Sequence, residues 1–402
     1  MEHDTQKYDV LILGGGPAGL STALHLKQRA PQLPDRILLL EKAHYPRPKL
    51  CAGGLTVDAE ILLEGLGLDV SEVPHADASE AHFDFEGKGL EISLPKRRTL
   101  RIVRRDEFDA WLAGKAERRG IEIREGVTVK DVRPDAGGVT VITDQGEFRA
   151  QAVVGADGSN GVTRRCVLPK MPVYTARVLE ILTPTSSALK GTSPKYDELQ
   201  SYLGEEGRGA VAYFDFFAVP EGIAGYTWDF PTQVKEQPMR CWGIYDTNML
   251  ANTSRPPLKK PLREEMARHG YNLDEYEIKG HPIRWFDPSN RFSVPRVLLV
   301  GDAAGADPLF GEGISMALGY GKLAAGELER AFSTGDFSFR GYKRRLARSA
   351  LGRTLFARWF IASIIYPLKW RWFQILLWRI LKPAVVAASW LFILNWGKKL
   401  KA

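Results

Sequence analysis

Short apolar runs alternate with segments of helical spacing in two parts of the chain, residues 8–41 and residues 296–330. Residues 8–13 and 36–41 are short and almost continuously apolar, the pattern of strands that are buried on both faces. Residues 20–29 between them repeat apolar positions at helical spacing, and residues 296–300 followed by 314–330 show the same order of strand and helix. Buried strands that alternate with helices predict a parallel sheet covered by helices.

The middle of the chain has a different pattern. Residues 127–129, 139–143 and 147–151 are three short runs that predict a β-meander. Residues 213–217 and 226–230 alternate as strands do, so that Phe214 and Phe216 share one face, and so do Tyr226, Trp228 and Phe230. The expected fold class is α/β: a Rossmann-like domain interleaved with an α+β, antiparallel-sheet domain, followed by a C-terminal helical tail.

Composition supports two domains in one chain. The 402 residues include 44% hydrophobic residues, enough for two sizeable cores. Charged residues make up 26%, and this balance excludes a disordered chain, a collagen and a protein with many membrane spans. Three cysteines are too few for a disulfide framework, and no basic-then-apolar export signal opens the sequence. We therefore expect a cytoplasmic protein.

The basic charge lies in the tail. From Arg340 onward there are 14 basic residues and no acidic ones, although the net charge of the whole chain is only +7. Six of the ten tryptophans also lie there: Trp359, Trp370, Trp372, Trp378, Trp390 and Trp396. A basic, tryptophan-rich and acid-free segment favours an anionic surface. Its many Leu, Ile, Phe and Val residues suit lipid better than nucleic acid, so no nucleic-acid partner is expected.

The same tail is too interrupted for a membrane span. Its longest uncharged stretch, residues 383–397, has 15 residues, whereas a spanning helix needs about 20. We expect two or three short amphipathic helices in the membrane interface, and hence peripheral (monotopic) association through residues 340–402. A helical cap packed on the protein or on a partner is the alternative. If the tail is only an anchor, removing residues from about Gly352 onward leaves a soluble protein that keeps its cofactor.

A glycine-rich turn follows the first strand. Residues 14–19, Gly-Gly-Gly-Pro-Ala-Gly, satisfy G-x-G-x-x-G at the start of the first helix. Gly14 permits the tight turn, Gly16 lets a pyrophosphate approach the backbone, and Gly19 lets the helix pack on the strand. Glu41 ends the second strand, where a carboxylate binds ribose hydroxyls. Strand, turn, helix and acid together predict a dinucleotide site.

Two later segments narrow the nucleotide to a flavin. Residues 153–159 contain an apolar strand that ends in Asp157-Gly158, and residues 296–305 repeat this pattern with Gly301-Asp302. A carboxylate at a strand end accepts hydrogen bonds from ribityl hydroxyls. The glycine-rich helix start at Gly313 can bring N–H groups to the flavin ring, where negative charge builds on reduction.

In this order and spacing the motifs resemble those of flavoproteins shaped like aromatic-ring hydroxylases. The set is Gly14-x-Gly16-x-x-Gly19 with Glu41, Arg105-x-x-Phe108-Asp109, Gly155-Ala-Asp157-Gly158 and Gly301-Asp302. Within that superfamily the chain resembles the geranylgeranyl reductase family. The resemblance lies in residues 46–55 (Pro-Arg-Pro-Lys-Leu-Cys-Ala-Gly-Gly-Leu), residues 226–231 (Tyr-Thr-Trp-Asp-Phe-Pro) and residues 301–314. Ala52 departs from the family loop, which has glycine at this position.

The resemblance implies FAD as the cofactor and a site built from these motifs. The residues expected to bind FAD are Gly14, Gly16, Pro17, Ala18, Gly19, Glu41, Lys42, Lys49, Cys51, Ala52, Gly53, Arg105, Val129, Asp157, Gly158, Gly301, Asp302, Gly311, Gly313 and Ile314. The residues expected to contact substrate are Phe214, Phe216, Tyr226, Trp228 and Phe230. An ordinary sheet core is the alternative for these rings.

The expected catalytic residues are Cys51, Tyr226 and Trp228. In the resembling family the matching cysteine lies near the flavin ring, which implies a proton donor or a contact with the flavin face; a small buried apolar residue is the alternative. His44 is a weaker acid–base candidate. Cys166 and Cys241 are expected to be structural, and the seven histidines show no ligand spacing, so no metal site is expected.

The resemblance implies an FAD-dependent reductase that saturates carbon–carbon double bonds. Its substrate would be a prenyl (geranylgeranyl-type) lipid or a prenylquinone, reduced by hydride transfer from N5 of the reduced flavin. The electron donor would be NAD(P)H or a ferredoxin-like protein. An FAD-dependent monooxygenase that hydroxylates an aromatic or lipid substrate is the alternative. A flavin halogenase and a non-catalytic, membrane-docked flavoprotein that holds a lipid or a partner are further rivals.

The expected domain organisation is interleaved. The FAD-binding domain would comprise residues 1–75, 100–170 and 282–335. The substrate domain would comprise residues 76–99 and 171–281, and residues 336–402 would form the basic, membrane-associated region. This arrangement would turn the mouth of an apolar tunnel toward the bilayer.

Overall fold

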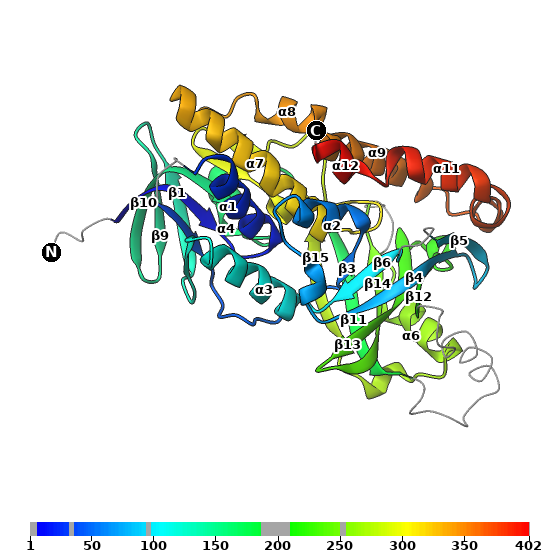
Figure 1. Ribbon diagram of the computed structural model, residues 1–402. Helices are drawn as coiled ribbons and strands as arrows, with labels where there is room; N and C mark the ends of the chain where they lie inside the picture. Colours follow the sequence, from blue (N-terminus) through cyan, green and yellow to red (C-terminus); the bar gives the residue numbers. More distant parts are fainter. Residues whose placement is uncertain (1–5, 32–35, 94–97, 186–209, 250–254, 402) are drawn as a thin grey trace.

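Two sheets form the frame of the molecule (Figure 1). The computed structural model describes residues 6–31, 36–93, 98–185, 210–249 and 255–401. The first sheet has the order β16-β17-β10-β1-β2-β7, with the β8–β9 hairpin attached to β10, and its central strands are parallel. Its strands are β1 (Gln6–Leu13), β2 (Ile37–Leu40), β7 (Glu122–Arg124), β8 (Val129–Pro134), β9 (Val139–Thr143), β10 (Gly146–Gly155), β16 (Ser293–Val294) and β17 (Val297–Leu299).

The second sheet is mixed and curled. Its order is β15-β11-β14-β13-β12-β4-β6-β3, with β5 paired to β4. All its pairs are antiparallel except β4 with β12, so the expectation of an antiparallel sheet misses one parallel pair. Its strands are β3 (Gly54–Leu55), β4 (His75–Asp84), β5 (Gly89–Ser93), β6 (Leu100–Val103), β11 (Thr175–Pro184), β12 (Ala210–Asp215), β13 (Gly225–Val234), β14 (Gln237–Asp246) and β15 (Lys279–Arg284).

Helices α1 and α7 pack on the first sheet, and the C-terminal tail helices lie over the second (Figure 1). The helices before the tail are α1 (Pro17–Arg29), α2 (Val57–Glu64), α3 (Arg105–Glu117), α4 (Val162–Val167), α6 (Lys259–Arg268) and α7 (Ile314–Thr334), with short 3₁₀ turns at Val70–Glu72, Val219–Glu221, Leu273–Glu275 and Gly301–Ala303. The tail contains α8 (Tyr342–Arg348), α9 (Ala350–Ile365), α10 (Arg371–Ile375), a π-helical turn (Leu376–Ile380), α11 (Lys382–Phe392) and α12 (Trp396–Lys401). This arrangement confirms the expected fold class.

Two of the expected domain boundaries, at residues 100 and 281, fall within the second sheet. β6 pairs with β4, and β3 pairs with β6, in the second sheet. The boundary expected at residue 100 therefore lies within the second sheet, because β6 continues the ladder begun by β4. The expected end of the substrate unit at residue 281 lies within β15 for the same reason.

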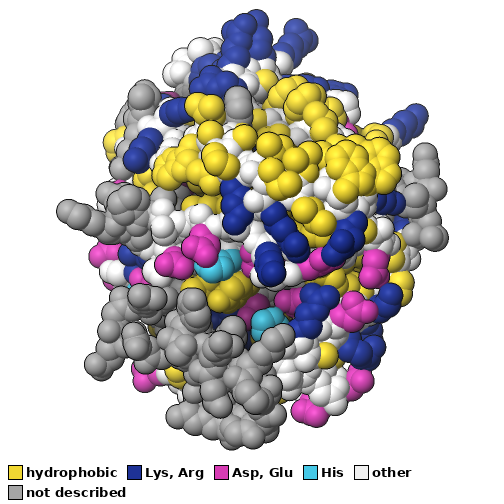
Figure 2. All heavy atoms as spheres, turned by 90° about the vertical axis from the view of Figure 1, so that its right-hand side faces the viewer, with side chains coloured by type: hydrophobic (Ala, Val, Ile, Leu, Met, Phe, Trp, Pro, Cys, Tyr) yellow, Lys and Arg dark blue, Asp and Glu magenta, His cyan; other side chains and the backbone are white. Residues whose placement is uncertain are grey.

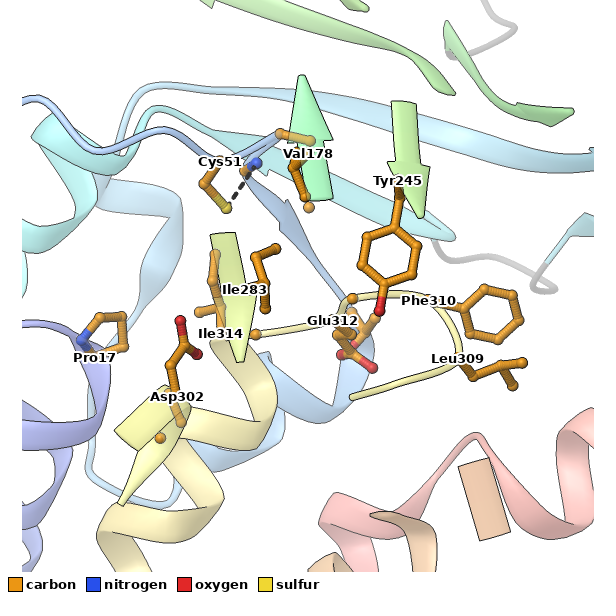
Figure 3. Close-up of a pocket in the computed structure, with 18 of the residues that line it drawn as sticks. Pro17, Cys51, Val178, Tyr245, Ile283, Asp302, Leu309, Phe310, Glu312 and Ile314 are labelled. Carbon is orange, nitrogen blue, oxygen red and sulfur yellow. Dashed lines mark hydrogen bonds between the residues drawn. The ribbon is translucent and has the colours of Figure 1, made fainter. Parts of the chain in front are cut away.

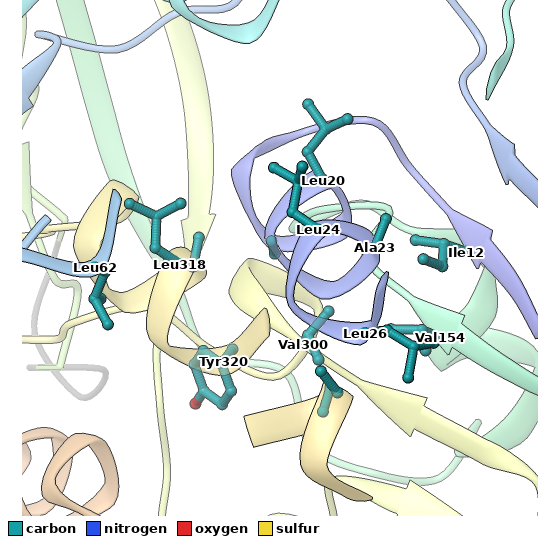
Figure 4. Packing of buried hydrophobic residues seen from close by; sticks show 14 of the residues in the cluster. Ile12, Leu20, Ala23, Leu24, Leu26, Leu62, Val154, Val300, Leu318 and Tyr320 are labelled. Carbon is teal, nitrogen blue, oxygen red and sulfur yellow. The ribbon is translucent and has the colours of Figure 1, made fainter. Parts of the chain in front are cut away.

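The largest core lies between the first sheet and helices α1 and α7 (Figure 4). Ile12 lies beside Ala23 of α1 and Val154 lies beside Leu26, all of them buried (Figure 4). The two helices lie so close together that Ser21 of α1 donates a hydrogen bond of 2.8 Å to the Leu318 carbonyl of α7. This contact fixes both helices, whose N-termini lie at the candidate site, against one sheet.

The tail differs from the expectation of two or three interfacial helices. Its helices lie over the second sheet and beside α2 and α7 (Figure 1). Trp378 and Trp396 are buried in the two largest cores, because each finds a packing partner inside the protein. Within the described residues no single helix is long and apolar enough to cross a bilayer; Arg371–Ile380 and Lys382–Leu400 reach that length together but are bent by 75°.

Candidate active site

A cavity of about 1280 Å³ lies between the two sheets and beneath the tail helices. One end is formed by the turn before α1, the end of β2 and the turns after β10 and β17. The other end is formed by the face of the second sheet and by α9, α11 and the π-helical turn. Figure 3 shows Asp302 and Pro17 on one side and Tyr245, Phe310 and Leu309 on the other. The cavity therefore joins the glycine motifs to an apolar chamber.

The nucleotide end combines an uncapped helix with a braced carboxylate. Gly16 is the N-cap of α1, and no side chain caps the free N–H groups of its first turn. Glu41 is buried at the end of β2, where Oε2 accepts a hydrogen bond from Gly15 N (2.8 Å) and Oε1 accepts one from Ala43 N (3.1 Å). Helix N–H groups favour phosphate, and a carboxylate at this strand end favours ribose hydroxyls.

Two arginines, Arg47 and Arg105, contact the same carboxylate, Asp109, beside this end of the cavity. Arg105 donates two hydrogen bonds of 2.8 Å to Asp109, one turn further along α3. Arg47 lies 3.1 Å from Asp109 and 3.4 Å from Glu41. The Arg-x-x-Phe-Asp motif thus holds Arg47 against the cavity through Asp109, a link that the sequence motif alone does not reveal.

Two further strand ends place carboxylates at this end of the cavity. Asp302 lies after β17, faces the cavity and accepts a hydrogen bond of 3.2 Å from Ser159 Oγ (Figure 3). Asp157 lies after β10, but its Oδ2 accepts hydrogen bonds from the backbone and hydroxyl of Thr163, at 2.8 and 2.9 Å. Asp157 therefore braces its turn, and burial raises its pKa. Gly313 is the N-cap of α7, again without a capping side chain.

These features fit FAD. Two helices present free N–H groups to one cavity, and carboxylates stand at the ends of β2 and β17. A Cβ added at Gly16 would meet only Arg47 Nη2, at 3.8 Å, so the missing side chain leaves room for a ligand rather than for protein. Of the residues expected to bind FAD, all except Gly19 line the cavity; Gly19 packs α1 on the turn, because a Cβ there would overlap the Gly14 carbonyl.

The loop that carries Cys51 lines the same cavity. Cys51 Sγ accepts a hydrogen bond of 3.4 Å from Gly53 N, and Ile283 and Ile314 lie between it and Asp302 (Figure 3). Gly53 has a φ of 79°, whereas Ala52 does not have a positive φ, which explains why alanine is tolerated where the family loop has glycine. His44 pairs with Glu125 at 3.2 Å, and its side chain is 77% exposed.

Lys49 and His281 form a pair that sequence reasoning missed. Lys49 Nζ lies 2.8 Å from His281 Nε2 in the cavity wall. Burial lowers the pKa of Lys49, and burial together with Lys49 lowers the pKa of His281 to about 4. His281 is therefore neutral near pH 7, and its Nε2 accepts a hydrogen bond from the Lys49 ammonium group. No local pattern marks His281, because it lies on β15, far from Lys49 in the sequence.

The aromatic residues expected from the sequence form one wall of the chamber. Phe214, Phe216, Tyr226, Trp228 and Phe230 are all buried and all line the cavity. Ring centroids are 4.9 Å apart for Phe214 and Phe230 and 5.5 Å apart for Phe216 and Tyr226. The Tyr226 hydroxyl donates to the Phe310 carbonyl, and burial raises its pKa well above the ordinary value. Tyr226 therefore holds its proton; catalytic roles for Tyr226, Trp228 and Cys51 stay predictions.

The tail supplies the opposite wall. Trp378 stacks on Phe216 with ring centroids 4.1 Å apart, and Ile361, Ile365 and Ile393 also line the chamber. Arg358 of α9 is buried and lies 2.6 Å from both Asp307 and Glu312, in the loop before α7. From the sequence, Arg358, Trp378 and the three isoleucines were expected to belong to a membrane anchor, because composition does not reveal which face of a helix packs against the protein.

One group of described residues has metal-like geometry outside this cavity. Ligand atoms of Glu80, His82 and Glu91 lie within 4.8 Å of one another. His82 Nε2 is already 3.4 Å from Glu80 Oε2, and the three residues are at least partly exposed. We assign them no role.

The fold and the cavity define an FAD-dependent oxidoreductase. A family model described as FAD binding domain matches residues 7–319, and the chain belongs to that family. The chain is 26% identical over 343 residues to a digeranylgeranylglycerophospholipid reductase of Methanosarcina mazei, covering 83% of this chain and 77% of the relative. It is 27% identical over 354 residues to a menaquinone reductase of Mycolicibacterium smegmatis, covering 82% and 78%.

A solved structure has the same architecture. It is a geranylgeranyl bacteriochlorophyll reductase-like protein of Thermoplasma acidophilum, with a TM-score of 0.77 and 20% identity over 99% of both chains. Similarity at this identity establishes the fold. The expectations of the fold class, of FAD and of a geranylgeranyl-reductase-like enzyme are confirmed.

Proposed function

We propose that the chain saturates carbon–carbon double bonds of a prenyl lipid or prenylquinone. One observation carries this proposal: the cavity that holds the FAD motifs continues into a chamber walled by aromatic and aliphatic side chains. The names of the two reductases matched above, one a digeranylgeranylglycerophospholipid reductase and the other a menaquinone reductase, agree with this proposal. An unactivated alkene offers no charged group, so its binding must come from apolar contact.

The apolar chamber is suited to that task. Burial of hydrocarbon contributes about 0.8 kcal/mol per CH₂ group, so a long prenyl chain binds without a salt bridge. Arg358, a buried cation of this wall, is already paired with Asp307 and Glu312 and offers no free charge. Phe216 and Trp378, whose rings stack on each other, both line the chamber and contribute apolar surface for contact with an alkene.

The chain's own residues would bind and orient the cofactor. The first turns of α1 and α7 would contact the pyrophosphate and the flavin ring, and Glu41 and Asp302 would accept hydrogen bonds from hydroxyl groups. When bound and reduced, the flavin supplies a hydride. Cys51 and the residues around it would exclude water from the region where substrate and flavin meet. We propose that residues 1–75, 100–170 and 282–335 bind FAD and that residues 76–99 and 171–281 bind substrate, with β6 and the end of β15 contributing to the second sheet as described above.

We also propose that the tail docks the enzyme on an anionic membrane. Of the eleven large hydrophobic side chains that are exposed among the described residues, nine lie between Phe356 and Leu391. Figure 2 shows a band of hydrophobic side chains bordered by Lys and Arg on the face that bears these helices. Exposed Lys382, Lys398 and Lys399 add positive charge, and the tail has no acidic residue to oppose it.

The test is an anaerobic reaction. The FAD-loaded protein is reduced chemically, so that neither NAD(P)H nor a ferredoxin-like donor need be known, and is then mixed with candidate prenyl lipids in vesicles. We expect the oxidised flavin spectrum to return with a prenyl lipid, together with a product heavier by two hydrogens. A fully saturated lipid of the same length is the control and should leave the flavin reduced.

The same experiment separates the alternative activity. A monooxygenase would leave the flavin reduced without oxygen, and with oxygen it would release a product heavier by one oxygen atom. Reoxidation by no prenyl lipid, combined with oxygen incorporation into an aromatic compound or a lipid, would contradict the proposal.

A further inference from the structure

A buried carboxyl group in the cavity wall has no assigned task. Glu180 lies on β11, is 5% exposed and lines the cavity. The backbone N–H of Cys51 hydrogen-bonds to its carboxylate, but Oε2 has no hydrogen-bond partner among the described residues. An unpartnered carboxylate is costly to bury, so the position calls for a physical reason.

The strand register places Glu180 beside the aromatic wall. Figure 3 shows Val178 next to Cys51 at the cavity, and Glu180 follows two residues later on the same face of β11. Glu180 is paired with Gly243 of β14, which is paired in turn with Trp228 of β13. A Cβ at Gly243 would overlap the Trp228 ring, so the indole extends over this glycine toward β11. Only a glycine separates Glu180 from Trp228 along this row.

The surroundings keep this carboxyl group close to its titration point. Burial raises the pKa of Glu180 to about 7, although Arg104, Lys279, Arg105 and the Cys51 N–H favour the charged form. Cys241 of β14 also faces it. Near pH 7 a large fraction of Glu180 therefore carries a proton. β15 is the edge strand next to β11, and Lys279 of β15 pairs with Glu180 in the strand register, so one strand separates Glu180 from the edge of the sheet.

Other acid–base groups of the wall are engaged differently. The Tyr226 hydroxyl donates to the Phe310 carbonyl and holds its proton, and His281 is neutral with Lys49 on its Nε2. Asp58 accepts a hydrogen bond of 2.7 Å from Gly397 N at the tail. Asp157 braces its own turn at the flavin end. Glu180 combines a free oxygen with a place beside the aromatic wall.

From this geometry we infer that Glu180 is the proton donor of the reduction, an assignment that rests on the proposed function. Saturation of an alkene breaks its π bond and forms two C–H bonds. One carbon receives a hydride with its electron pair from the reduced cofactor, which becomes oxidised by two electrons. The other carbon receives the proton of the Glu180 carboxyl group, which becomes a carboxylate. Water returns that proton after product leaves.

The first test measures single-turnover reoxidation of the reduced, FAD-loaded protein by a prenyl lipid as a function of pH. We expect the rate to fall as pH rises through about 7, because the acid form of Glu180 is lost. Glu180→Gln keeps the shape of the side chain but has no acidic proton to give. We therefore expect its reoxidation rate to be at least about 10²-fold lower than that of wild type and to lack this pH dependence. FAD content and flavin absorbance should match wild type. Glu180→Asp should restore part of the rate.

A second readout does not depend on turnover. The infrared difference between wild type and Glu180→Gln should contain a protonated carboxyl band that disappears with an apparent pKa of about 7. Asp215→Asn is the matched control: Asp215 is another buried carboxyl whose pKa burial raises to about 6, but it does not line the cavity. This control should keep the wild-type pH dependence of the rate.

Two results would overturn the inference. One is a Glu180→Gln protein that reoxidises within about threefold of wild type with the same pH profile. The other is the absence of the protonated band at any pH near 7. Failure of the proposed function itself is recognisable separately, because wild type would then react with no prenyl lipid whatever the infrared spectrum shows.

Discussion

Single residues at the nucleotide end act by leaving space and by holding one another in place. Gly16 has room for a side chain in the protein itself, since a Cβ there would meet only Arg47 Nη2 at 3.8 Å.

At the other end of the cavity, Arg358 satisfies two buried carboxylates at once. Burial raises the pKa of Asp307; burial alone would also raise that of Glu312, but Arg358, Ser315 and Thr56 hold it below its ordinary value.

Gly16→Ala should separate folding from cofactor binding. The added methyl group fits the cavity but would occupy the place that we propose for a phosphate at the start of the helix. We expect unchanged thermal stability of the apoprotein and an FAD dissociation constant raised by about tenfold or more. Gly114→Ala is the control, because a Cβ there meets only Arg118 Nη1, at 3.9 Å, within α3. Equal FAD affinity of both variants would contradict this role for Gly16.

Arg358→Met should destabilise the fold. The substitution leaves Asp307 and Glu312 buried without their counter-charge, which typically costs about 3–5 kcal/mol. Urea unfolding of the variant against wild type measures this difference. Arg353→Met, an exposed arginine on the same helix, should change stability by less than about 0.5 kcal/mol. Similar losses in both variants would show that the buried triad contributes nothing specific.

At the scale of elements, α9 presents apolar residues on two faces. Leu351, Leu355 and Ala362 are buried against the protein, whereas Phe356 and Phe360 are about half exposed, at 51% and 52%. A helix that is apolar all round is normally buried or in contact with lipid. Because its inner face carries Arg358 and cavity residues, the tail is part of the fold as well as a candidate docking surface. Removal from Gly352 onward would open the cavity, so the tail is not a detachable anchor.

Substitution of the outward tryptophans should weaken docking without unfolding. Trp370, Trp372 and Trp390 are 58%, 62% and 41% exposed, and Trp390 also borders the cavity. Their simultaneous replacement by Ser should lower partition onto anionic vesicles by about tenfold or more, because interfacial anchoring depends on buried apolar area. Val173→Ser, an exposed apolar residue outside the tail, is the control. Unchanged cosedimentation of the triple variant would contradict docking through this face.

At the scale of the whole molecule, the cavity joins three parts that are distant in the sequence. The first sheet supplies the cofactor end, the second sheet the aromatic wall, and the tail the remaining wall. Adjacent residues of α11 can test this continuity, since Ala388 lines the cavity and Ala387 is exposed outside it.

Ala388→Trp should narrow the chamber without touching the FAD end. We expect normal FAD content and a kcat/KM for a detergent-dispersed prenyl lipid lowered by about tenfold or more. Ala387→Trp adds the same ring outside the cavity and should keep the wild-type value. Equal kcat/KM in both variants would show that substrate does not use this part of the chamber.

Local signals made the cofactor end predictable from sequence. The buried run of β1, the glycine turn and Glu41 lie within one short segment, and each needs only its neighbours to be interpreted. The stacking of Trp378 on Phe216 and the link from Arg358 to Asp307 join distant segments, so no local pattern encodes them. Glu180 escaped notice because an acid in a strand is ordinary until its register places it in the cavity.

The account depends most on electron transfer from the flavin to an alkene in this cavity. The direct measurement is an anaerobic titration of the fully reduced protein with one prenyl lipid, following flavin absorbance and product mass together. We expect one double bond to be saturated for each flavin that becomes oxidised. Flavin that stays reduced over the whole titration, or oxidation without loss of a double bond, would contradict the account.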